Sequence, residues 1–358
     1  MPKGSGSRKT FDEVPDAGAI ARVDAWLKSR VPELASSALP IVTQYTGGAS
    51  NWTYRLRYPS HDLVLRRPPA GTKAKSAHDM GRESQILNRL APLYPLVPET
   101  IAYCGDPEVL GADFYVMRCI DGVILRKNLP PDLRLSSETA RILCLHFIDA
   151  LVALHRIDPR AAGLDDLDKG AGYAKRQVAG WTDRYRKART RNVPRAEKVM
   201  QWLSVHAPAD VRTCIIHNDF RFDNVVLDRA EPTRIVGVLD WEMATVGDPL
   251  MDLAGALAYW VEAGDDPFFR ALRRQPTHLP GMLKRREVVT AYCRAMELPE
   301  PEWTFYEVFG LFRLAAIAQQ IYFRYHRKET RNPAFKHFWL YVHYLIWRAN
   351  RVLKRSGN

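Results

Sequence analysis

The stretch HNDFRFDN, from His217 to Asn224, sets six polar residues and two phenylalanines between the apolar runs CII and VVLD. Short apolar, β-branched runs of this kind predict two strands. Aspartate and asparagine are common in turns because their side chains bond to nearby backbone, so a plain hydrogen-bonded turn is one interpretation. The alternative is that this loop is the centre of a reaction site.

The order His217, Asp219 and Asn224 matches the H-x-D-x-x-x-x-N pattern of phosphotransferase catalytic loops. Phosphoryl transfer needs a carboxylate beside the acceptor hydroxyl, which Asp219 fits, and an oxygen ligand for Mg²⁺, which the Asn224 amide fits. Asp240 ends the next strand-like run, RIVGVLD, after a predicted hairpin that would bring it close to Asn224. We therefore predict Asp219 as the catalytic residue and Asn224 and Asp240 as metal ligands, with ATP and Mg²⁺ as cofactors.

The other polar residues around this loop fit supporting roles. His217 is interpreted as a hydrogen-bonding residue that sets the loop, and Asp223 as a turn or surface residue. Arg221 either contacts an anion of the substrate or pairs with a nearby carboxylate. Asp252 follows on the next predicted helix and is expected to bond back to the loop, while Glu242 is either a further metal-shell group or a partly exposed surface residue.

The segment TGGASNWTY, between two predicted strands, is a candidate phosphate-binding loop. Gly47 and Gly48 would let backbone N–H groups approach phosphates, and Ser50 and Asn51 would add side-chain donors. A Gly-Gly pair also marks many plain hairpins, so that interpretation stays open. The P-loop pattern G-x-x-x-x-G-K-[ST] is absent from the sequence.

A cation and a carboxylate downstream of this segment complete the candidate nucleotide site. Arg66 ends the strand-like run VLRR, and Glu83 lies on the predicted helix SAHDMGRESQILNRL, for which Ser76 is a possible N-cap. A guanidinium can bind phosphate oxygens in a bidentate manner, and a helix glutamate can orient it. The alternative is a surface ion pair, which contributes little to stability.

The wider pattern predicts an α+β chain with two lobes. Residues 1–37 read as a tail and a helix, with the helix over Phe11 to Leu34, and residues 38–120 as a small antiparallel sheet with one helix. Residues 121–358 are dominated by helical periodicity and hold the catalytic loop and the expected acceptor site. A small β-rich N-lobe is thus followed by a large, mainly helical C-lobe.

Composition favours a soluble protein that meets anionic partners. The formal net charge is +12, and residues 270–358 alone hold 17 lysines and arginines against six acidic residues. Phosphates, nucleic acid, CoA esters or acidic membranes fit such a surface, although scattered charges more often form a solvated face. Five dispersed cysteines argue against a disulfide framework or a zinc site. Without a signal peptide or a membrane-length apolar run, we expect a cytoplasmic location.

Together these motifs resemble the aminoglycoside phosphotransferase and choline kinase-like superfamily, which shares the protein-kinase fold. HNDFRFDN and VLDWEMATVGDPLMDLA carry the specific likeness. GGASNWTY, VLRRPPAG, SAHDMGRE and FYVMRCIDG look closer to one branch, the phosphotransferase domain that animals fuse to acyl-CoA dehydrogenases. The resemblance covers most of the chain, from about Ile41 to the C-terminal helices, and implies a bilobal protein-kinase-like fold.

The resemblance also implies roles for individual residues. Asp219 would be the base and Asn224 and Asp240 the Mg²⁺ ligands. Arg66 would contact ATP phosphates, oriented by Glu83. The residues from Met117 to Ile120, Cys119 among them, would lie at the hinge near adenine. Two positions depart from the superfamily pattern: Arg66 stands where lysine is typical, and Asn218 stands where glycine usually follows the histidine.

These observations predict an ATP- and Mg²⁺-dependent kinase of a small-molecule hydroxyl. The basic C-terminal region favours an anionic acceptor such as a hydroxyacyl-CoA or a hydroxy acid over a polycationic aminoglycoside. Aminoglycoside O-phosphorylation remains an alternative, as does a non-catalytic, nucleotide-binding pseudokinase, which Arg66 supports. No recognised nucleic-acid motif accompanies the basic clusters, so nucleic acid is a disfavoured partner.

Overall fold

The computed structural model describes residues 15–45, 51–69 and 79–357 of the chain. Within these residues, no helix combines the length and apolar character needed to cross a bilayer. The longest apolar run of the sequence instead opens the amphipathic helix α11 (Phe338–Arg355), which buries one side and exposes the other. All five cysteines are free thiols.

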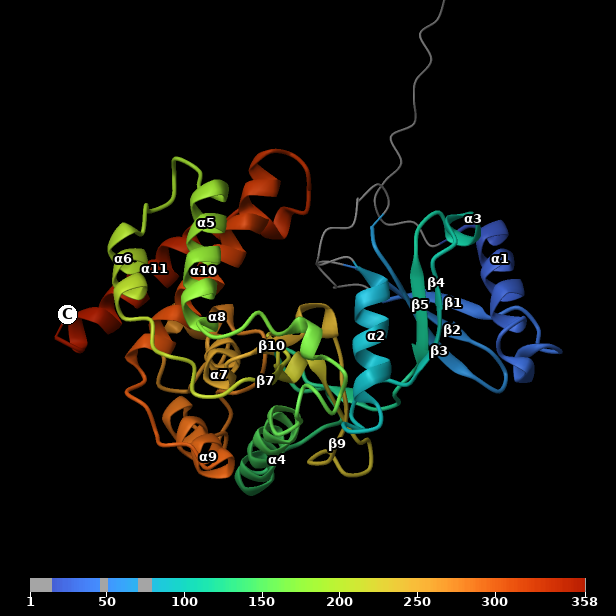
Figure 1. Cartoon of the computed structure of the whole chain (residues 1–358), viewed down its shortest axis with the longest axis horizontal. Helices are drawn as coiled ribbons and strands as arrows, with labels where there is room; N and C mark the ends of the chain where they lie inside the picture. Colours follow the sequence, from blue (N-terminus) through green and yellow to red (C-terminus); the bar gives the residue numbers. More distant parts are fainter. Residues whose placement is uncertain (1–14, 46–50, 70–78, 358) are drawn as a thin grey trace, which may run out of the picture. The chain divides into compact units, whose positions relative to one another are not determined.

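The chain folds into two compact units. The first runs to Asp121 and also takes in the later segment Leu239–Met243, and the second contains Gly122–Val238 and the chain from Ala244 onward. The first is built on an antiparallel sheet and the second is mainly helical (Figure 1). The predicted α+β architecture with two lobes is therefore confirmed.

One five-stranded antiparallel sheet, in the order β1-β2-β3-β5-β4, forms the first unit. Its strands are β1 (Ile41–Gln44), β2 (Trp52–Arg57), β3 (Asp62–Arg67), β4 (Thr100–Cys104) and β5 (Phe114–Arg118). Helices α1 (Ala17–Lys28) and α2 (Met80–Leu90) cover opposite faces of this sheet, and α3 (Pro107–Leu110) packs against α1 (Figure 1). Successive side chains of a strand point to opposite faces, so Leu63 and Leu65 join the core under α1. The same alternation directs Arg66 to the face that α2 covers.

Capping residues fix where the two longer helices of this unit begin. Asp16 caps α1 by accepting a hydrogen bond from the Ala19 amide at 2.8 Å, and Asp79 caps α2 through the Arg82 amide at 2.8 Å. The predicted cap of α2, Ser76, lies outside the described residues, and the prediction is wrong because Asp79 holds that position. The helix predicted over 11–34 ends at Lys28, and Pro32 opens a separate 3₁₀ turn.

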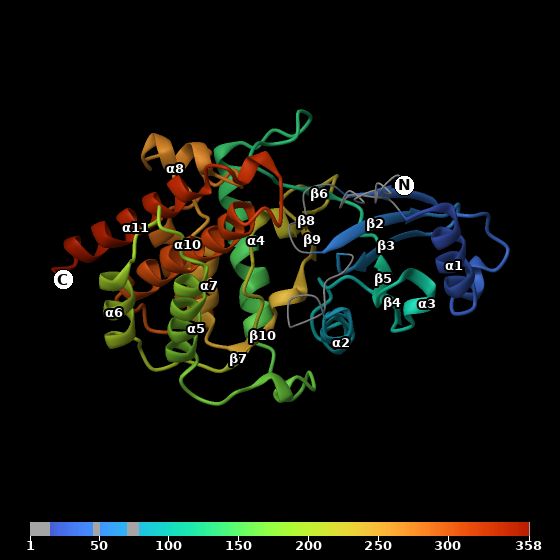
Figure 2. The same ribbon diagram turned by 90° about the horizontal axis from the view of Figure 1, so that it is seen from above.

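The second unit surrounds three short strand pairings with helices. Its helices are α4 (Ser137–His155), α5 (Tyr173–Ala188), α6 (Glu197–Val205), α7 (Pro249–Leu257), α8 (Pro267–Leu272), α9 (Arg285–Met296), α10 (Thr304–His326) and α11. Its strands are β6 (Val123–Ile124), β7 (Cys214–Ile216), β8 (Val225–Leu227), β9 (Ile235–Val238) and β10 (Thr245–Gly247). Strand β8 pairs with β6 and β9, and β7 pairs with β10. Helix α10 runs through the centre, against α5, α7 and α11 (Figure 2).

A glycine lets α10 approach α7 closely. A Cβ placed on Gly310 would lie 2.5 Å from the backbone oxygen of Ala254 in α7, closer than real Cβ contacts allow. Because helix α7 carries Asp252, this contact helps to fix the position of a predicted site residue. Gly180 in α5 differs, since its added Cβ would meet only the flexible end of the Arg184 side chain, at 3.2 Å.

We expect the same substitution to have opposite effects at these two glycines. Gly310→Ala forces α10 and α7 apart and should lower the free energy of unfolding by about 2 kcal/mol, despite the better helix propensity of alanine. Gly180→Ala should raise it by about 0.5–1 kcal/mol, because propensity decides where space is available. Urea denaturation of the two variants measures both. Equal effects would contradict the role given to Gly310.

Candidate active site

Two buried phenylalanines anchor the HNDFRFDN loop in the second unit. The loop leaves β7, makes a 3₁₀ turn (Phe222–Asn224) and enters β8. Phe220 and Phe222 are both fully buried, with ring centroids 4.8 and 4.4 Å from that of Phe147 in α4. Phe222 also packs on Trp260 at 5.6 Å. These rings tie the loop to the core, so the polar residues between them are held in fixed positions.

The Asp252 carboxylate organises the start of the loop. Its Oδ2 accepts a hydrogen bond from the His217 amide at 2.8 Å, and its Oδ1 accepts one from the Asn218 amide, also at 2.8 Å. Asn218 has a left-handed backbone with φ of 65°, a conformation that asparagine tolerates better than most residues and glycine adopts freely. Its carbonyl accepts a hydrogen bond from Arg313 Nη2 at 2.6 Å. Asparagine in place of glycine therefore still permits the turn.

Two further buried residues support Asp252. Tyr292 Oη lies 2.6 Å from His155 Nδ1, and His155 Nε2 lies 3.1 Å from Asp252 Oδ2. Burial alone would raise the pKa of Asp252, but its hydrogen bonds and its attraction to His155 and His217 hold that pKa below the usual value. His155 and Tyr292 sit on α4 and α9, far apart in sequence and outside any motif, so sequence reasoning missed them.

Asp219 and Asn224 are joined directly. Asn224 Nδ2 donates to Asp219 Oδ2 at 3.0 Å and to the Asp219 carbonyl at 2.9 Å. His217 Nδ1 accepts from the Asp219 amide at 3.2 Å, and the His217 side chain is completely buried. Asp219 keeps about a fifth of its side chain exposed, at 21%. The loop thus presents one partly accessible carboxylate with an amide fixed beside it.

Arg221 pairs with carboxylates on both sides. Its Nη2 lies 3.0 Å from Asp219 Oδ2, its Nε lies 3.3 Å from Asp223 Oδ1, and its guanidinium stands 4.4 Å from the Tyr259 ring. Burial raises the pKa of Asp223, with the Arg221 charge acting in the opposite direction. Asp223 does lie in a turn, but its side chain is only 11% exposed, so its interpretation as a possible surface residue is wrong.

A second cluster of charges, centred on Arg66, lies in the first unit. Arg66 Nη2 is 3.5 Å from Glu83 Oε1, 2.9 Å from Asp240 Oδ1 and 3.7 Å from Glu242 Oε2. Asn51 Nδ2 donates to Glu242 Oε2 at 2.8 Å. Arg66 and Glu83 are 8% and 1% exposed, so the alternative of a surface ion pair is wrong. Among the described residues, one guanidinium thus faces three carboxylates.

Burial and charge act in opposite directions on the pKa values of the Arg66 cluster. Burial acts to lower the pKa of Arg66, but the carboxylates around it keep it well above its ordinary value. Burial raises the pKa of Glu83. In the described part of the chain, Arg66 Nε and Glu83 Oε2 are buried without a hydrogen-bond partner. Such an arrangement suits a site that exchanges internal pairs for a ligand and its metal.

The predicted metal ligands have the chemistry that Mg²⁺ requires. Asp240 has a left-handed backbone with φ of 70° and follows β9 by two residues. Val238 of that strand pairs with Val225, the neighbour of Asn224. Within residues 15–45, 51–69 and 79–357, no three His, Cys, Asp or Glu side chains form a metal-binding group. Both predicted ligands carry side-chain oxygens, the ligand type that Mg²⁺ prefers in proteins.

The remaining predicted nucleotide contacts are only partly described. Met117 is buried in β5 opposite Val64 of β3, and the Cys119 amide donates to the Asp62 carbonyl at 2.9 Å just after β5 ends. The Cys119 thiol lies 3.9 Å from the Tyr45 hydroxyl. Three predicted phosphate-contacting residues lie outside the described residues: Gly47, Gly48 and Ser50.

Comparisons with known proteins show the family of the chain. Residues 41–288 match the family described as phosphotransferase enzyme family. Mouse acyl-CoA dehydrogenase family member 10 is 35% identical over 319 residues, which are 88% of this chain and 29% of that protein. The chain therefore spans less than a third of the length of that relative. The likeness to the phosphotransferase branch associated with acyl-CoA dehydrogenases is confirmed.

Solved structures show the same fold. A protein of Ralstonia eutropha, assigned provisionally to the aminoglycoside phosphotransferases, has a TM-score of 0.77 and 27% identity, and the match covers 94% of this chain and 98% of that one. An aminoglycoside phosphotransferase in complex with GDP and kanamycin has a TM-score of 0.62 and 13% identity, with 92% and 98% covered. At that identity the second likeness concerns the fold alone.

We expect Asp252→Asn to destabilise the second unit. The amide has one acceptor for two backbone N–H groups and places a donor where a carboxylate oxygen stood, so the free energy of unfolding should fall by about 2–4 kcal/mol at pH 7. A pKa held below its ordinary value of 3.8 contributes stability above that pH, and the contribution disappears as the pH falls through the lowered value. The gap between wild type and variant should therefore narrow in acid.

Urea unfolding between pH 7 and pH 3 measures this gap. Asp149→Asn, an exposed change on α4, serves as the control and should have little effect at any pH. A gap that stays constant down to the lowest pH would show that the Asp252 charge does not hold the loop.

Proposed function

The chain belongs to the phosphotransferase enzyme family, and from that premise we propose that it transfers the γ-phosphoryl group of ATP, with Mg²⁺, to a hydroxyl of a small anionic molecule. A hydroxyacyl-CoA or a hydroxy acid is the proposed acceptor. The observation that carries the proposal is the Asp219 carboxylate, which is partly exposed, bonded to Asn224 and held on a buried frame. Phosphoryl transfer depends mainly on positioning and charge stabilisation, and a rigid loop supplies both.

Asp219 is proposed to orient the acceptor hydroxyl and to accept its proton. Its Oδ2 is occupied by Arg221 and Asn224. The other carboxylate oxygen is then the one that receives the hydroxyl. Arg221 keeps the negative charge of Asp219 balanced before the acceptor arrives and is placed to meet an anionic group of it.

Asn224 and Asp240 are proposed to hold Mg²⁺. Because Asn224 Nδ2 is directed to Asp219, Oδ1 is the atom of this amide that serves as ligand. When bound, the ion neutralises phosphate charge and draws the β- and γ-phosphates into one orientation. Asp240 is paired with Arg66 at 2.9 Å, so the proposal requires this pair to loosen when nucleotide and metal bind.

Arg66 is proposed to bind the ATP phosphates, with Glu83 as its positioning residue. The guanidinium is enclosed by carboxylates, and phosphate oxygens are equivalent partners for it. Asn51, which directly precedes strand β2, would reach the phosphates. Met117 and Cys119 would border the adenine base. The nucleotide found in the aminoglycoside phosphotransferase complex supports this use of the fold.

Charge and kinship together favour an anionic acceptor. A net charge of +12 opposes a polycationic aminoglycoside, and excess basic residues lie in the C-terminal region expected to receive the acceptor. The relative named above is an acyl-CoA dehydrogenase family member, in which a domain of this family would meet acyl-CoA chemistry. A hydroxyl on an acyl-CoA chain combines both features.

We expect Asp219→Asn to lower kcat for phosphorylation of a hydroxyacyl-CoA by about 10²–10⁴-fold, the range of general-base catalysis. The amide is nearly isosteric, so Mg-ATP binding measured by calorimetry should stay close to wild type. Asp183→Asn, an exposed change on α5, is the control and should retain full activity. Equal turnover by wild type and Asp219→Asn would show that Asp219 is not the base.

The same assay identifies the acceptor class. Wild type should phosphorylate hydroxyacyl-CoA or hydroxy acid acceptors faster than kanamycin, and the reverse order would favour an aminoglycoside phosphotransferase. Tight Mg-ATP binding without turnover on any acceptor would favour a pseudokinase.

We expect Glu83→Gln to raise the KM for ATP by about tenfold, since loss of one charge-assisted contact to Arg66 costs about 1.4 kcal/mol of phosphate binding. The KM for the acceptor should not change. Steady-state kinetics with each substrate varied in turn separates the two. Glu99→Gln, an exposed change in a pair with Arg118, is the matched control. A shift in the acceptor KM instead would contradict the assignment of this cluster to the nucleotide.

A further inference from the structure

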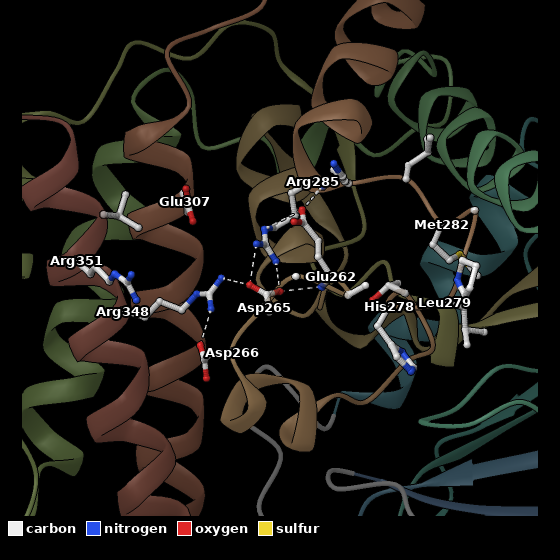
Figure 3. Close-up of a pocket in the computed structure, with 18 of the residues that line it drawn as sticks. Glu262, Asp265, Asp266, His278, Leu279, Met282, Arg285, Glu307, Arg348 and Arg351 are labelled. Atoms are coloured by element: carbon white, nitrogen blue, oxygen red, sulfur yellow. Dashed lines mark hydrogen bonds and ion pairs between the residues drawn. The ribbon is translucent and has the colours of Figure 1, made fainter. Parts of the chain in front are cut away.

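A cavity of about 670 Å³ lies within the second unit, outside the groups assigned above. It is bordered by the segments 262–266 and 277–285, by Glu307 of α10 and by the last turns of α11 (Figure 3). Its volume falls in the range of small-molecule sites. We propose that this cavity receives the phosphorylated nucleotide end of an acyl-CoA acceptor, an inference that rests on the proposed function.

The acidic residues on one side of the cavity form ion pairs and hydrogen bonds with neighbouring side chains. Asp265 Oδ2 accepts from Arg285 Nη1 at 2.7 Å, and Asp265 Oδ1 accepts from Arg348 Nη2 at 2.6 Å. Figure 3 shows both arginines reaching Asp265 from different elements. Asp266 accepts from the Tyr344 hydroxyl, and Glu262 lies 3.4 Å from Arg285 Nε. This network braces the wall, and its two arginines offset all but one of the three negative charges there.

Three cations around the cavity stand apart from that network. In the part of the chain that the structure describes, Lys284, Arg351 and Arg355 form no ion pair. Glu307 is the one lining carboxylate outside the network, so positive charge predominates among the unpaired groups. Three cations would attract the negative charge of a nucleoside diphosphate that carries an additional phosphate.

An aromatic ring at the same place offers a surface for a base. Trp347, one turn before Arg351 on α11, is 50% exposed, and the Arg351 guanidinium stands 5.3 Å from its ring. Stacking of a nucleobase on an exposed aromatic ring, beside arginines that bind phosphate, is a recurrent mode of nucleotide recognition. The cavity therefore combines the two features that an adenosine phosphate needs.

The cavity wall is continuous with the Asp219 loop. Trp260 packs on Phe222 of the loop, and it bonds to the wall through its carbonyl, which accepts from Arg285 Nη1 at 2.7 Å, and its Nε1, which donates to the Leu283 carbonyl at 2.8 Å. The preceding residue, Tyr259, contacts Arg221. One short segment thus joins the loop to the cavity.

The length of helix α11 indicates how far the cavity lies from the Asp219 loop. Burial raises the pKa of the Tyr341 phenol, on which the charges of Tyr259 and Arg221 also act. Arg351 follows ten residues later on the same helix, which is about 15 Å along its axis. An acceptor with its hydroxyl at Asp219 and phosphates at Arg351 needs a long arm between them. The pantetheine arm of CoA has this character, whereas a free hydroxy acid does not.

Calorimetry on the full chain tests the cavity with CoA, dephospho-CoA and pantetheine as probes. Excess Mg²⁺ and a non-hydrolysable ATP analogue keep CoA out of the nucleotide site. We expect CoA to bind more tightly than dephospho-CoA, and pantetheine to bind weakest. The triple variant Lys284→Gln, Arg351→Gln, Arg355→Gln should weaken CoA binding about tenfold or more and leave pantetheine unchanged.

A second triple variant controls for total charge. Arg286→Gln, Arg327→Gln and Arg331→Gln remove the same charge from exposed positions that do not line the cavity. It should bind CoA as wild type does, and Trp347→Ala should weaken CoA more than pantetheine. Equal losses in both triple variants, or no CoA binding by wild type, would overturn the proposal.

Kinetics separates this inference from the proposed function. If the cavity serves the acceptor, the first triple variant raises the KM for hydroxyacyl-CoA with little change in kcat. If wild type phosphorylates hydroxyacyl-CoA and the first triple variant has the same KM for it, the cavity is refuted and the kinase assignment stands. If wild type binds CoA, the first triple variant does not, and no hydroxyacyl-CoA is phosphorylated, the assignment as a hydroxyacyl-CoA kinase is refuted and the cavity is supported.

Discussion

The interaction on which the candidate site depends is the double hydrogen bond from the His217 and Asn218 amides to the Asp252 carboxylate. A buried carboxylate is costly unless several donors satisfy it, and His155 supplies another at 3.1 Å. Because both oxygens are used, helix α7 and the loop cannot shift independently. The left-handed turn at Asn218 and the bond from Arg313 to its carbonyl follow from this attachment.

The rest of the loop is divided between apolar and polar partners. Phe220 and Phe222 are buried against Phe147, while the residues next to them in sequence, Asp219 and Arg221, keep part of their surface accessible. Loops carry reactive groups well when a rigid scaffold positions them. Here the scaffold is the aromatic core of the second unit, so a carboxylate close to solvent is held as firmly as a core residue.

Much of this arrangement could be predicted from the sequence, because it depends on local spacing. The strand-like runs on either side of HNDFRFDN predicted a loop at these residues. The two-lobed α+β fold and the family are confirmed. Asp252 was expected to bond back to the loop, and it does so through two backbone amides. The roles of Asp219, Asn224 and Asp240 stay predictions.

What the sequence did not reveal depends on contacts between distant residues. His155, Tyr292 and Gly310 belong to three helices and carry no motif, so only their packing identifies them. Asp223 lies in a turn as predicted, but its burial depends on contacts with Arg221 and the surrounding core that the sequence does not show. The network of Asp265 with two arginines likewise joins residues up to 83 positions apart.

The short segment Leu239–Met243 has a consequence for any attempt to take the protein apart. Its flanking strands belong to the second unit, but its own residues belong to the first, so the chain passes between the units three times. A fragment cut at Asp121 would retain Arg66 with Glu83 and lose Asp240 and Glu242, leaving a buried guanidinium with one carboxylate in place of three. The small sheet is therefore not a self-contained module, because two of the three carboxylates around Arg66 come from residues that the ribosome makes more than a hundred positions later.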